Sequence, residues 1–255
     1  MKYKKLLILI TCLLFITVAV FCFVSAFRVT DVELYAQTVD NSNENVMSKC
    51  EGKLKKYEGK NLIFISTDEI ESELINLSGY IDVLSVEKNF PNKLTVKIKE
   101  KSEAFTIKNG NEYYSLDKDF CVLSKKTDVK NNVDGKSNVI LDISVADYNT
   151  ALKVGEKIKL YDSETENYLS LASSLICANR KDISKVLVTV KKDGVEYKTL
   201  TLTMKEGVSF KILKANEETI LKINKTLEFY STLSNKGYGE YVAVLENSGN
   251  VTVKQ

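Results

Sequence analysis

The first pattern in the chain is an unbroken hydrophobic run close to its N-terminus. Residues 6–27 read LLILITCLLFITVAVFCFVSAF and contain no charged side chain. At about 1.5 Å per residue, a helix of this length crosses a hydrocarbon core of about 30 Å. The run therefore predicts a single transmembrane helix, whose apolar surface includes Leu6, Leu14, Val20 and Phe27.

A cleaved signal peptide is the alternative interpretation of this run, because small residues occur at 25–26. The hydrophobic region of a signal peptide usually has about 7 to 15 residues. The run over 6–27 is longer, so its length favours a retained anchor.

The charges that flank the run predict its orientation. Three lysines precede it, whereas one arginine and two acidic residues follow it closely. The positive-inside bias then places residues 1–5 in the cytoplasm and the rest of the chain outside. The lysines that carry this topology signal are Lys2, Lys4 and Lys5.

After the run, strand and helix periods alternate. A capping box at Ser66 and Glu69 predicts the start of a helix, which Gly79 would end. Alternating apolar positions on both sides of Pro91-Asn92 predict a β-hairpin. The expected order is a strand at 27–35, helices at about 43–57 and 66–79, and the two hairpin strands.

The second half of the chain has a similar mixture of patterns. Short strands are expected around 104–107 and 113–116, joined at Asn109-Gly110, and 124–138 indicates a solvated loop. A second capping box at Ser163 and Glu166 predicts a helix with residues 168, 171, 172, 175 and 176 inward. Alternating strands at about 186–212, a helix at 217–234 and two strands around Ser248-Gly249 complete an expected antiparallel sheet with one wet face.

Composition narrows the possible chemistry. The chain has no His, no Trp and one Pro in 255 residues. Ser-His-Asp and Cys-His catalysis and His-containing zinc sites are therefore excluded. Carboxylates on the predicted helices are interpreted as solvated faces, and glycine-rich phosphate loops are absent, so we expect a non-enzyme without metal or cofactor.

Charge distribution argues against nucleic acid as a partner. Three of the 36 basic residues lie within residues 1–27, which leaves 33 against 34 acidic residues in the remainder. A nucleic-acid-binding domain usually has a strongly positive surface.

The cysteines suggest no disulfide framework or metal site. Cys12 and Cys22 lie in the hydrophobic run, and the other three lack Cys-x-x-Cys spacing. Cys50 falls on the apolar face of a predicted helix, so we expect a buried thiol. The sequence leaves the redox state of Cys50, Cys121 and Cys177 open.

The order of these segments resembles the FtsQ/DivIB family of bacterial cell-division proteins. The resemblance rests on a single anchor followed by FRVTDVELY, GKNLIFIS and GYIDVLSVEKNFPNKLTVKIKEK, and on LKVGEKI, VSFKIL and the terminal strands further on. In that family the hairpin turn reads aromatic-Pro-Asn or aromatic-Pro-Asp, which corresponds here to Phe90, Pro91 and Asn92. Ala36, Lys88 and Glu103 depart from the family's usual Gly, Arg and Pro.

The resemblance implies an α+β fold class with an N-terminal transmembrane helix. A small POTRA domain with the order β-α-α-β-β would occupy 28–101. A mixed α/β domain with a mainly antiparallel sheet, the β domain, would occupy 102–255.

The resemblance also implies a non-catalytic scaffold at the division septum. The β domain would bind the extracytoplasmic parts of small single-pass partners of the FtsL and FtsB/DivIC type. A terminal strand with one unpaired side could accept an extended segment of such a partner. The candidate binding strand contains Tyr241, Val242, Val244 and Leu245, although the same strand could instead be an interior one that only fills the core.

Two other function classes remain open at this stage. One is a membrane-tethered extracytoplasmic sensor or ligand-binding protein of the cell envelope. The other is a hydrolase of wall glycans that uses two carboxylates. Binding of wall fragments would support the first, and turnover of peptidoglycan would support the second.

Overall fold

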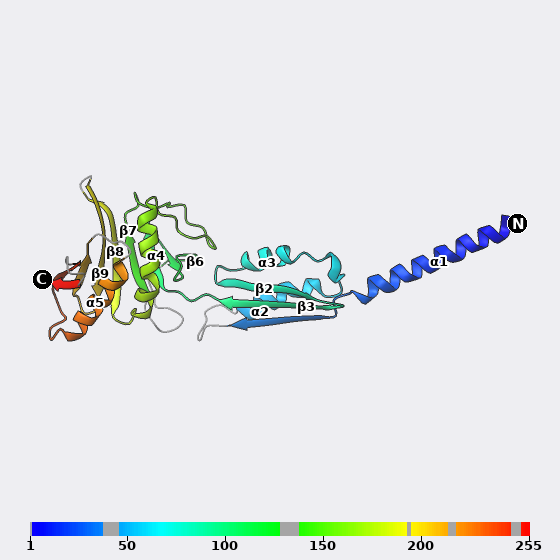
Figure 1. Cartoon of the computed structure of the whole chain (residues 1–255), viewed down its shortest axis with the longest axis horizontal. Helices are drawn as coiled ribbons and strands as arrows, with labels where there is room; N and C mark the ends of the chain where they lie inside the picture. Colours follow the sequence, from blue (N-terminus) through cyan, green and yellow to red (C-terminus); the bar gives the residue numbers. More distant parts are fainter. Residues whose placement is uncertain (1, 38–45, 128–137, 193–194, 214–217, 246–250) are drawn as a thin grey trace. The chain divides into compact units, whose positions relative to one another are not determined.

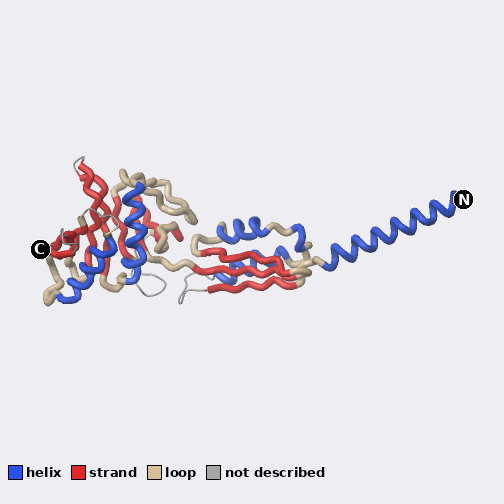
Figure 2. The backbone as a smooth tube through the Cα atoms, in the orientation of Figure 1, coloured by secondary structure: helices blue, strands red, loops and turns tan. Residues whose placement is uncertain are grey.

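A computed structural model of the chain describes residues 2–37, 46–127, 138–192, 195–213, 218–245 and 251–255. The described residues divide into two compact units, one that ends at Glu100 and one that begins at Lys101. The N-terminal helix belongs to the first unit. Each unit contains its own sheet (Figures 1 and 2).

The first unit has the predicted strand, helix, helix, strand, strand order after its long first helix. Its sheet has the order β1-β3-β2, with β1 parallel and β2 antiparallel to the central β3. The elements are α1 (Lys2–Ala26), β1 (Asp31–Gln37), α2 (Val46–Leu54), the 3-10 turns η1 (Lys55–Tyr57) and η2 (Leu62–Phe64), α3 (Thr67–Ile75), β2 (Ile81–Asn89) and β3 (Lys93–Glu100).

Local chemistry explains the boundaries of α3. The Ser66 hydroxyl accepts a hydrogen bond from the backbone N–H of Glu69, as the capping prediction required. The helix ends at Ile75, four residues before the predicted stop at Gly79. The stop prediction was wrong because the Leu77 N–H already donates to the Leu74 carbonyl, three residues back, at 3.1 Å and closes a tighter turn there.

Hydrophobic side chains from both helices and from β3 form the core of this unit. Their burial follows the helical period on one side and the two-residue strand period on the other. The fully buried set includes Cys50, Leu54, Ile70, Leu74, Leu94, Val96 and Ile98.

The second unit is built on a nine-stranded sheet with the order β12-β11-β10-β9-β8-β7-β4-β5-β6. Most of its strand pairs are antiparallel, and the pairs β4–β7, β7–β8 and β10–β11 are parallel. Its strands are β4 (Phe105–Asn109), β5 (Glu112–Leu116), β6 (Val122–Lys126), β7 (Val139–Ile143), β8 (Ile183–Lys192), β9 (Val195–Met204), β10 (Ser209–Ile212), β11 (Glu240–Leu245) and β12 (Val251–Lys254).

Helices α4 (Ser163–Ala178) and α5 (Thr219–Thr232) contact each other and pack on one face of this sheet. Alternate residues of the strands, such as Val186, Leu202 and Phe210, are fully buried beneath them. The predicted α+β fold class with a mainly antiparallel second sheet is confirmed.

The predicted cap of α4 and one of its predicted inward residues were wrong. Asp162, not Ser163, caps α4, because its carboxylate accepts a hydrogen bond from the Thr165 N–H at 2.9 Å. Glu166 instead accepts from the Leu160 N–H. Leu171, expected inward, is 51% exposed.

The turn between β4 and β5 lies one residue later than predicted. The tight turn between β4 and β5 is Gly110-Asn111, since Asn109 already pairs with Glu112. Gly110 has a φ of 62°, which favours glycine. Residues 128–137 of the predicted loop and the predicted Ser248-Gly249 turn lie outside the described residues.

Candidate interaction surfaces

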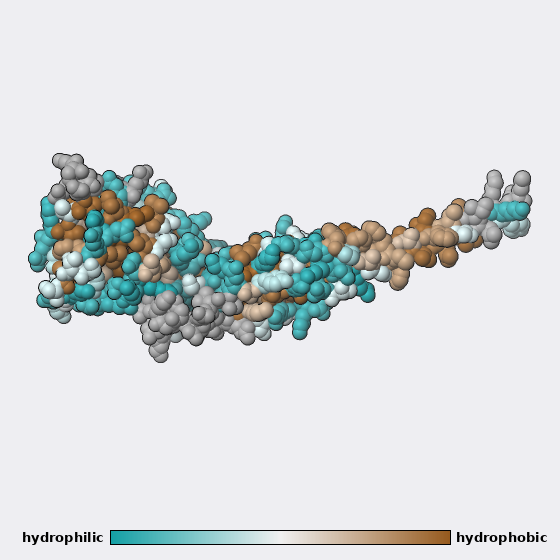
Figure 3. All heavy atoms as spheres, turned by 60° about the horizontal axis from the view of Figure 1, so that its bottom comes forward, coloured by the Kyte–Doolittle hydropathy of each residue, from teal (hydrophilic) through white to brown (hydrophobic). Residues whose placement is uncertain are grey.

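The predicted anchor residues lie along a helix with little burial. Leu6, Leu14 and Val20 are in α1, and Phe27 follows its last residue. Residues Leu9–Ala26 are long and apolar enough to cross a membrane, and none of this stretch is buried. Leu14 and Val20 are more than half exposed, and hydrophobic side chains cover α1 along much of its length in Figure 3.

The lysines of the predicted topology signal lie in the first part of the same helix. Lys2, Lys4 and Lys5 precede the apolar stretch and fall within α1. The structure contains no membrane, so the orientation that these lysines predict stays a prediction.

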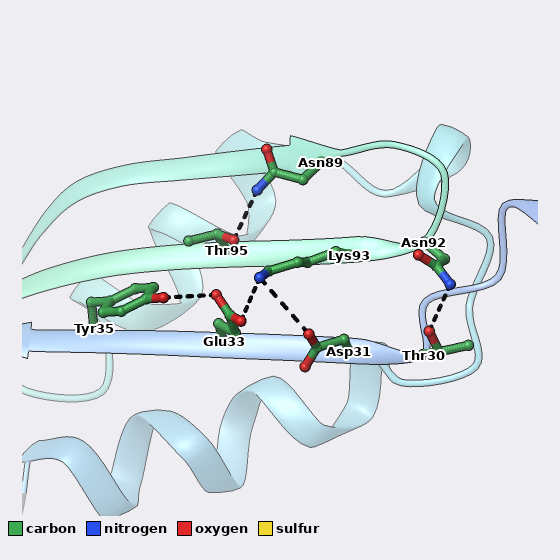
Figure 4. Close-up of polar contacts among 8 residues, drawn as sticks. All are labelled: Thr30, Asp31, Glu33, Tyr35, Asn89, Asn92, Lys93 and Thr95. Carbon is green, nitrogen blue, oxygen red and sulfur yellow. Dashed lines mark hydrogen bonds and ion pairs between the residues drawn. The ribbon is translucent and has the colours of Figure 1, made fainter.

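The hairpin turn joins β2 to β3 and is tied to β1. Asn92 donates from Nδ2 to the Thr30 hydroxyl at 2.8 Å, and the Thr30 N–H donates to the Asn92 carbonyl at 2.9 Å (Figure 4). The Phe90–Pro91 peptide bond is cis. Phe90 is 59% exposed, so the turn presents an aromatic ring to its surroundings.

Charged side chains line the β1 side of this sheet. Lys93 on β3 forms ion pairs with Glu33 and Asp31 on β1, and the Tyr35 hydroxyl donates to Glu33 at 2.9 Å (Figure 4). The hydrogen bond from Lys93 and then that from Tyr35 lower the pKa of Glu33. The hydrogen bond to Glu33 raises the pKa of Tyr35.

The β2 side is charged as well. Lys97 donates to Glu87 at 2.9 Å, and the Ser85 hydroxyl donates to the same carboxylate. Charged side chains on edge strands discourage pairing with another strand. Because both edges of the three-stranded sheet carry charged side chains, we expect a partner strand to add to the larger sheet instead.

The structure corrects the premise behind the predicted partner-binding strand. Tyr241–Leu245 lies in β11, which pairs with β10 in parallel on one side and with β12 in antiparallel on the other. This strand therefore has no open side. The parallel pairing is possible because α5 carries the chain from β10 back to the same end of the sheet.

The four candidate residues of β11 divide between the two faces of the sheet. Tyr241 aligns with Phe210, and its ring stacks on that ring with centroids 5.5 Å apart, so this partly buried residue packs against the core. Val242 aligns with Lys211 and Lys254, so it lies on the face opposite the helices, and Val244 follows the same period. Leu245 pairs with Val251.

The sheet edge that the sequence analysis did not single out is β12. It is the terminal strand of the nine-stranded sheet, beside β11, and it consists of Val251–Lys254. Val251 and Val253 pack against the hydrophobic core. The only signal in the sequence was the predicted pair of strands around Ser248-Gly249, whose second member is this strand.

A shallow hollow of about 500 Å³ lies on the face of the sheet opposite α4 and α5. Hydroxyl groups dominate its centre, and two lysines and one glutamate flank them. The lining residues are Lys185, Leu187, Thr189, Thr199, Thr201, Thr203, Ser209, Lys211, Glu240, Tyr241 and Val242. The hollow reaches β11 but does not include β12.

Metal-binding side chains and cysteine thiols are the remaining groups that could carry chemistry. Among the described residues, no cluster of three or more His, Cys, Asp or Glu could hold a metal ion. All five cysteines, each within the described ranges, are free thiols. Cys50 is fully buried, as predicted, and burial raises the pKa of its thiol to about 11.

Comparisons with known proteins agree with this architecture. Residues 41–101 match the family described as "POTRA domain, FtsQ-type". The chain is 24% identical over 182 residues to the cell division protein DivIB of Clostridium botulinum strain Hall, which covers 71% of this chain and 66% of that protein. The resemblance to the FtsQ/DivIB family is confirmed.

Other DivIB proteins give similar matches. Identity is 25% over 192 residues with DivIB of Clostridium tetani, and this alignment covers 69% of this chain and 66% of that protein. Identity is 27% over 103 residues with DivIB of Clostridium acetobutylicum, and this alignment covers 40% of this chain and 36% of that protein. The matches thus span slightly less than two thirds of the first relatives' own length.

Proposed function

We propose that this chain is a non-enzymatic, single-pass membrane scaffold of the bacterial division machinery. Three observations support it: the helix long enough to span a membrane, the FtsQ-type POTRA match and the similarity to DivIB proteins. In the proposed arrangement, residues 1–5 lie in the cytoplasm, and the POTRA domain (28–101) and β domain (102–255) lie outside, at the septum.

The partners that we propose are divisome membrane proteins of the FtsL and FtsB/DivIC type. The observation that carries the binding mode is the position of β12 at the end of the large sheet. An extended segment of a partner can hydrogen-bond to such a strand, while its side chains select the register. Nucleic acid and small substrates are not expected as partners.

We place the main partner contact on β12, next to β11, and we keep Val242 and Val244 of the predicted binding strand as additional contacts. Val242 and Val244 lie on the open face one strand from the edge. An added strand would lie next to β12 and two strand spacings, about 9.6 Å, from β11, so its long side chains would reach Val242 and Val244 across β12. Tyr241 then contributes by supporting the core beneath them.

Co-purification of the full-length protein from membranes tests the proposal. We expect two small single-pass proteins to be recovered with the chain and identified by mass spectrometry. Val244→Lys should reduce that recovery, because it places a charge where we expect an apolar contact. Val242→Glu is the better second variant, because a lysine there would lie between Lys211 and Lys254.

Leu187→Lys is the matched control for these variants. Leu187 is also half-buried on the open face, but it lies on β8 and aligns with Asp142 on β7, which suits a lysine. Undiminished recovery with Val244→Lys and Val242→Glu, in protein with an unchanged melting temperature, would contradict the edge mode. Loss of recovery with Leu187→Lys alone would favour the hollow as the binding place.

A ligand-binding role is the second candidate, and the hollow on the open face favours it. Its hydroxyl and lysine side chains suit a polar ligand such as a wall fragment. A thermal shift of the full-length protein with soluble peptidoglycan fragments, abolished by Leu187→Lys, would support this sensor function. Release of products from peptidoglycan would instead indicate a hydrolase.

A further inference from the structure

Exposed aromatic side chains lie on two segments, the η2 turn and the β2–β3 turn, that contact the chain at the end of α1. Phe64 is 81% exposed and Phe90 is 59% exposed, and Ile63 beside Phe64 is 36% exposed. The ring centroids of Phe90 and Phe27 are 5.8 Å apart, and those of Phe27 and Phe23 are 4.7 Å apart. Large apolar side chains left exposed together mark a contact surface.

Hydrogen bonds attach this surface to the helix end. The Asn61 side-chain amide donates to the Val24 carbonyl at 3.0 Å. The Leu62 N–H donates to the Phe27 carbonyl at 2.7 Å. The η2 segment, which contains Ile63 and Phe64, is therefore held beside the last turn of α1.

The position of the helix end fixes the depth of these groups. The apolar stretch Leu9–Ala26 accounts for about 27 Å of helix, close to the thickness of the hydrocarbon core. Its last turn then lies at the boundary between hydrocarbon and headgroups. Phe64 and Phe90 lie beside that turn, where an aromatic ring is favoured over full exposure to water.

Positive charge accompanies these rings. Lys88 donates from Nζ to the Ile63 carbonyl at 3.2 Å, and Lys60 lies over the Tyr57 ring with Nζ 4.8 Å from its centroid. Within the described ranges, neither lysine nor Arg28 forms an ion pair with a carboxylate. Lys93, one residue after the turn, differs because Glu33 and Asp31 neutralise it.

From this arrangement we propose that the POTRA domain of this chain contacts the bilayer directly through a membrane-contact surface. Phe64 and Phe90 insert at the interface of the leaflet in which α1 ends, and Ile63 lies beside them. Arg28, Lys60 and Lys88 bind anionic headgroups. The domain is thereby held against the bilayer at two further points, in addition to its covalent link to α1.

The absence of Trp in the natural chain allows a direct test. Phe64→Trp and Phe90→Trp each introduce a single tryptophan into the full-length protein. In nanodiscs we expect both to have blue-shifted emission and to lose most of their fluorescence when the lipid acyl chains are brominated near the headgroups. Leu84→Trp is the matched control, because Leu84 is 51% exposed on β2 and lies about 20 Å along the strand from the turn.

The charge component is tested separately. In nanodiscs with phosphatidylglycerol, quenching of the Phe64→Trp and Phe90→Trp proteins should exceed that in phosphatidylcholine alone, and Lys60→Glu with Lys88→Glu should remove the difference. Quenching of both probes no greater than that of Leu84→Trp would overturn the proposal. Strong quenching that is independent of lipid charge would overturn the role of the lysines and arginine.

Discussion

Asn92 and Thr30 are joined by two hydrogen bonds, one through their side chains and one through their backbones. Asn92 is the last residue of the hairpin turn, and Thr30 immediately precedes β1. The pair thus fastens the turn to the start of the parallel strand β1, 62 residues apart in sequence.

Asn92→Ala should loosen β1 because it removes the side-chain bond to Thr30. A single hydrogen bond contributes about 1 kcal/mol, so amide exchange in Asp31–Gln37 should be about fivefold faster. Asn89→Ala is the matched control, since it removes a bond to Thr95 within the hairpin and leaves Thr30 untouched. Equal acceleration of β1 exchange by both variants, measured by mass spectrometry on the full-length protein, would argue against this specific link.

Gly207→Ala should destabilise the β domain strongly. Gly207 has a φ of 112°, and an added Cβ would lie 2.2 Å from the Gly237 carbonyl oxygen. A strained backbone alone costs about 1–3 kcal/mol, and the clash would also displace the segment that enters β11. We expect a clear fall in melting temperature together with weaker partner recovery.

Gly52→Ala should change stability in the opposite direction to Gly207→Ala. Gly52 lies inside α2, and an added Cβ would meet nothing within 4 Å. Alanine is favoured over glycine in a helix interior by about 0.5–1 kcal/mol, so this variant should be slightly more stable. If both variants moved the melting temperature in the same direction, the local geometry at these glycines would not explain it.

Asp117→Asn should change how stability depends on pH. Asp117 is buried, and desolvation raises its pKa above the ordinary value of 3.8. The folded protein therefore holds this proton more tightly than the unfolded chain, and stability falls as pH rises from about 3.8 through the folded pKa.

Asparagine can keep the local structure while removing this titration. The N–H groups of Asp119 and Cys121 both donate to Oδ1 of Asp117, and the single carbonyl oxygen of asparagine can accept both. The melting temperature of Asp117→Asn should gain on that of the unmodified protein as pH rises through this window. A difference that is independent of pH between 3 and 7 would count against the burial argument.

Two proline substitutions can distinguish the role of the N–H groups on the outer edge of β12 from that of the N–H groups that bond to β11. Successive N–H groups of a strand point to opposite sides, so either Thr252→Pro or Val253→Pro removes an outward N–H and the other removes a bond to β11. The variant that keeps the melting temperature should lose recovery of the partners. Normal recovery with that variant would contradict strand addition at this edge.

The order of elements could be predicted from the sequence because it depends on local signals. Ser66 caps its helix because only its own side chain and the Glu69 N–H are involved. The cap at residue 162 was missed because a serine and an aspartate compete at adjacent positions, and only the structure decides between them.

The order of strands within a sheet could not be predicted in this way. The alternation in Tyr241–Leu245 identifies a strand but says nothing about its neighbours. Its place between β10 and β12 depends on how α5 packs, and α5 is itself unusual in its pattern. Lys222 is buried and donates to the Leu213 carbonyl, whereas Leu221 beside it is 44% exposed.

The position of β12 also has a consequence for when this protein can act. Its pairing partner β11 reaches β10 only after α5 has been made, and β12 itself ends at residue 254. Domains generally fold as units while synthesis proceeds from the N-terminus. In the proposed orientation, a chain still being exported therefore lacks the proposed docking edge, so assembly with partners would have to wait until translocation of the β domain is complete.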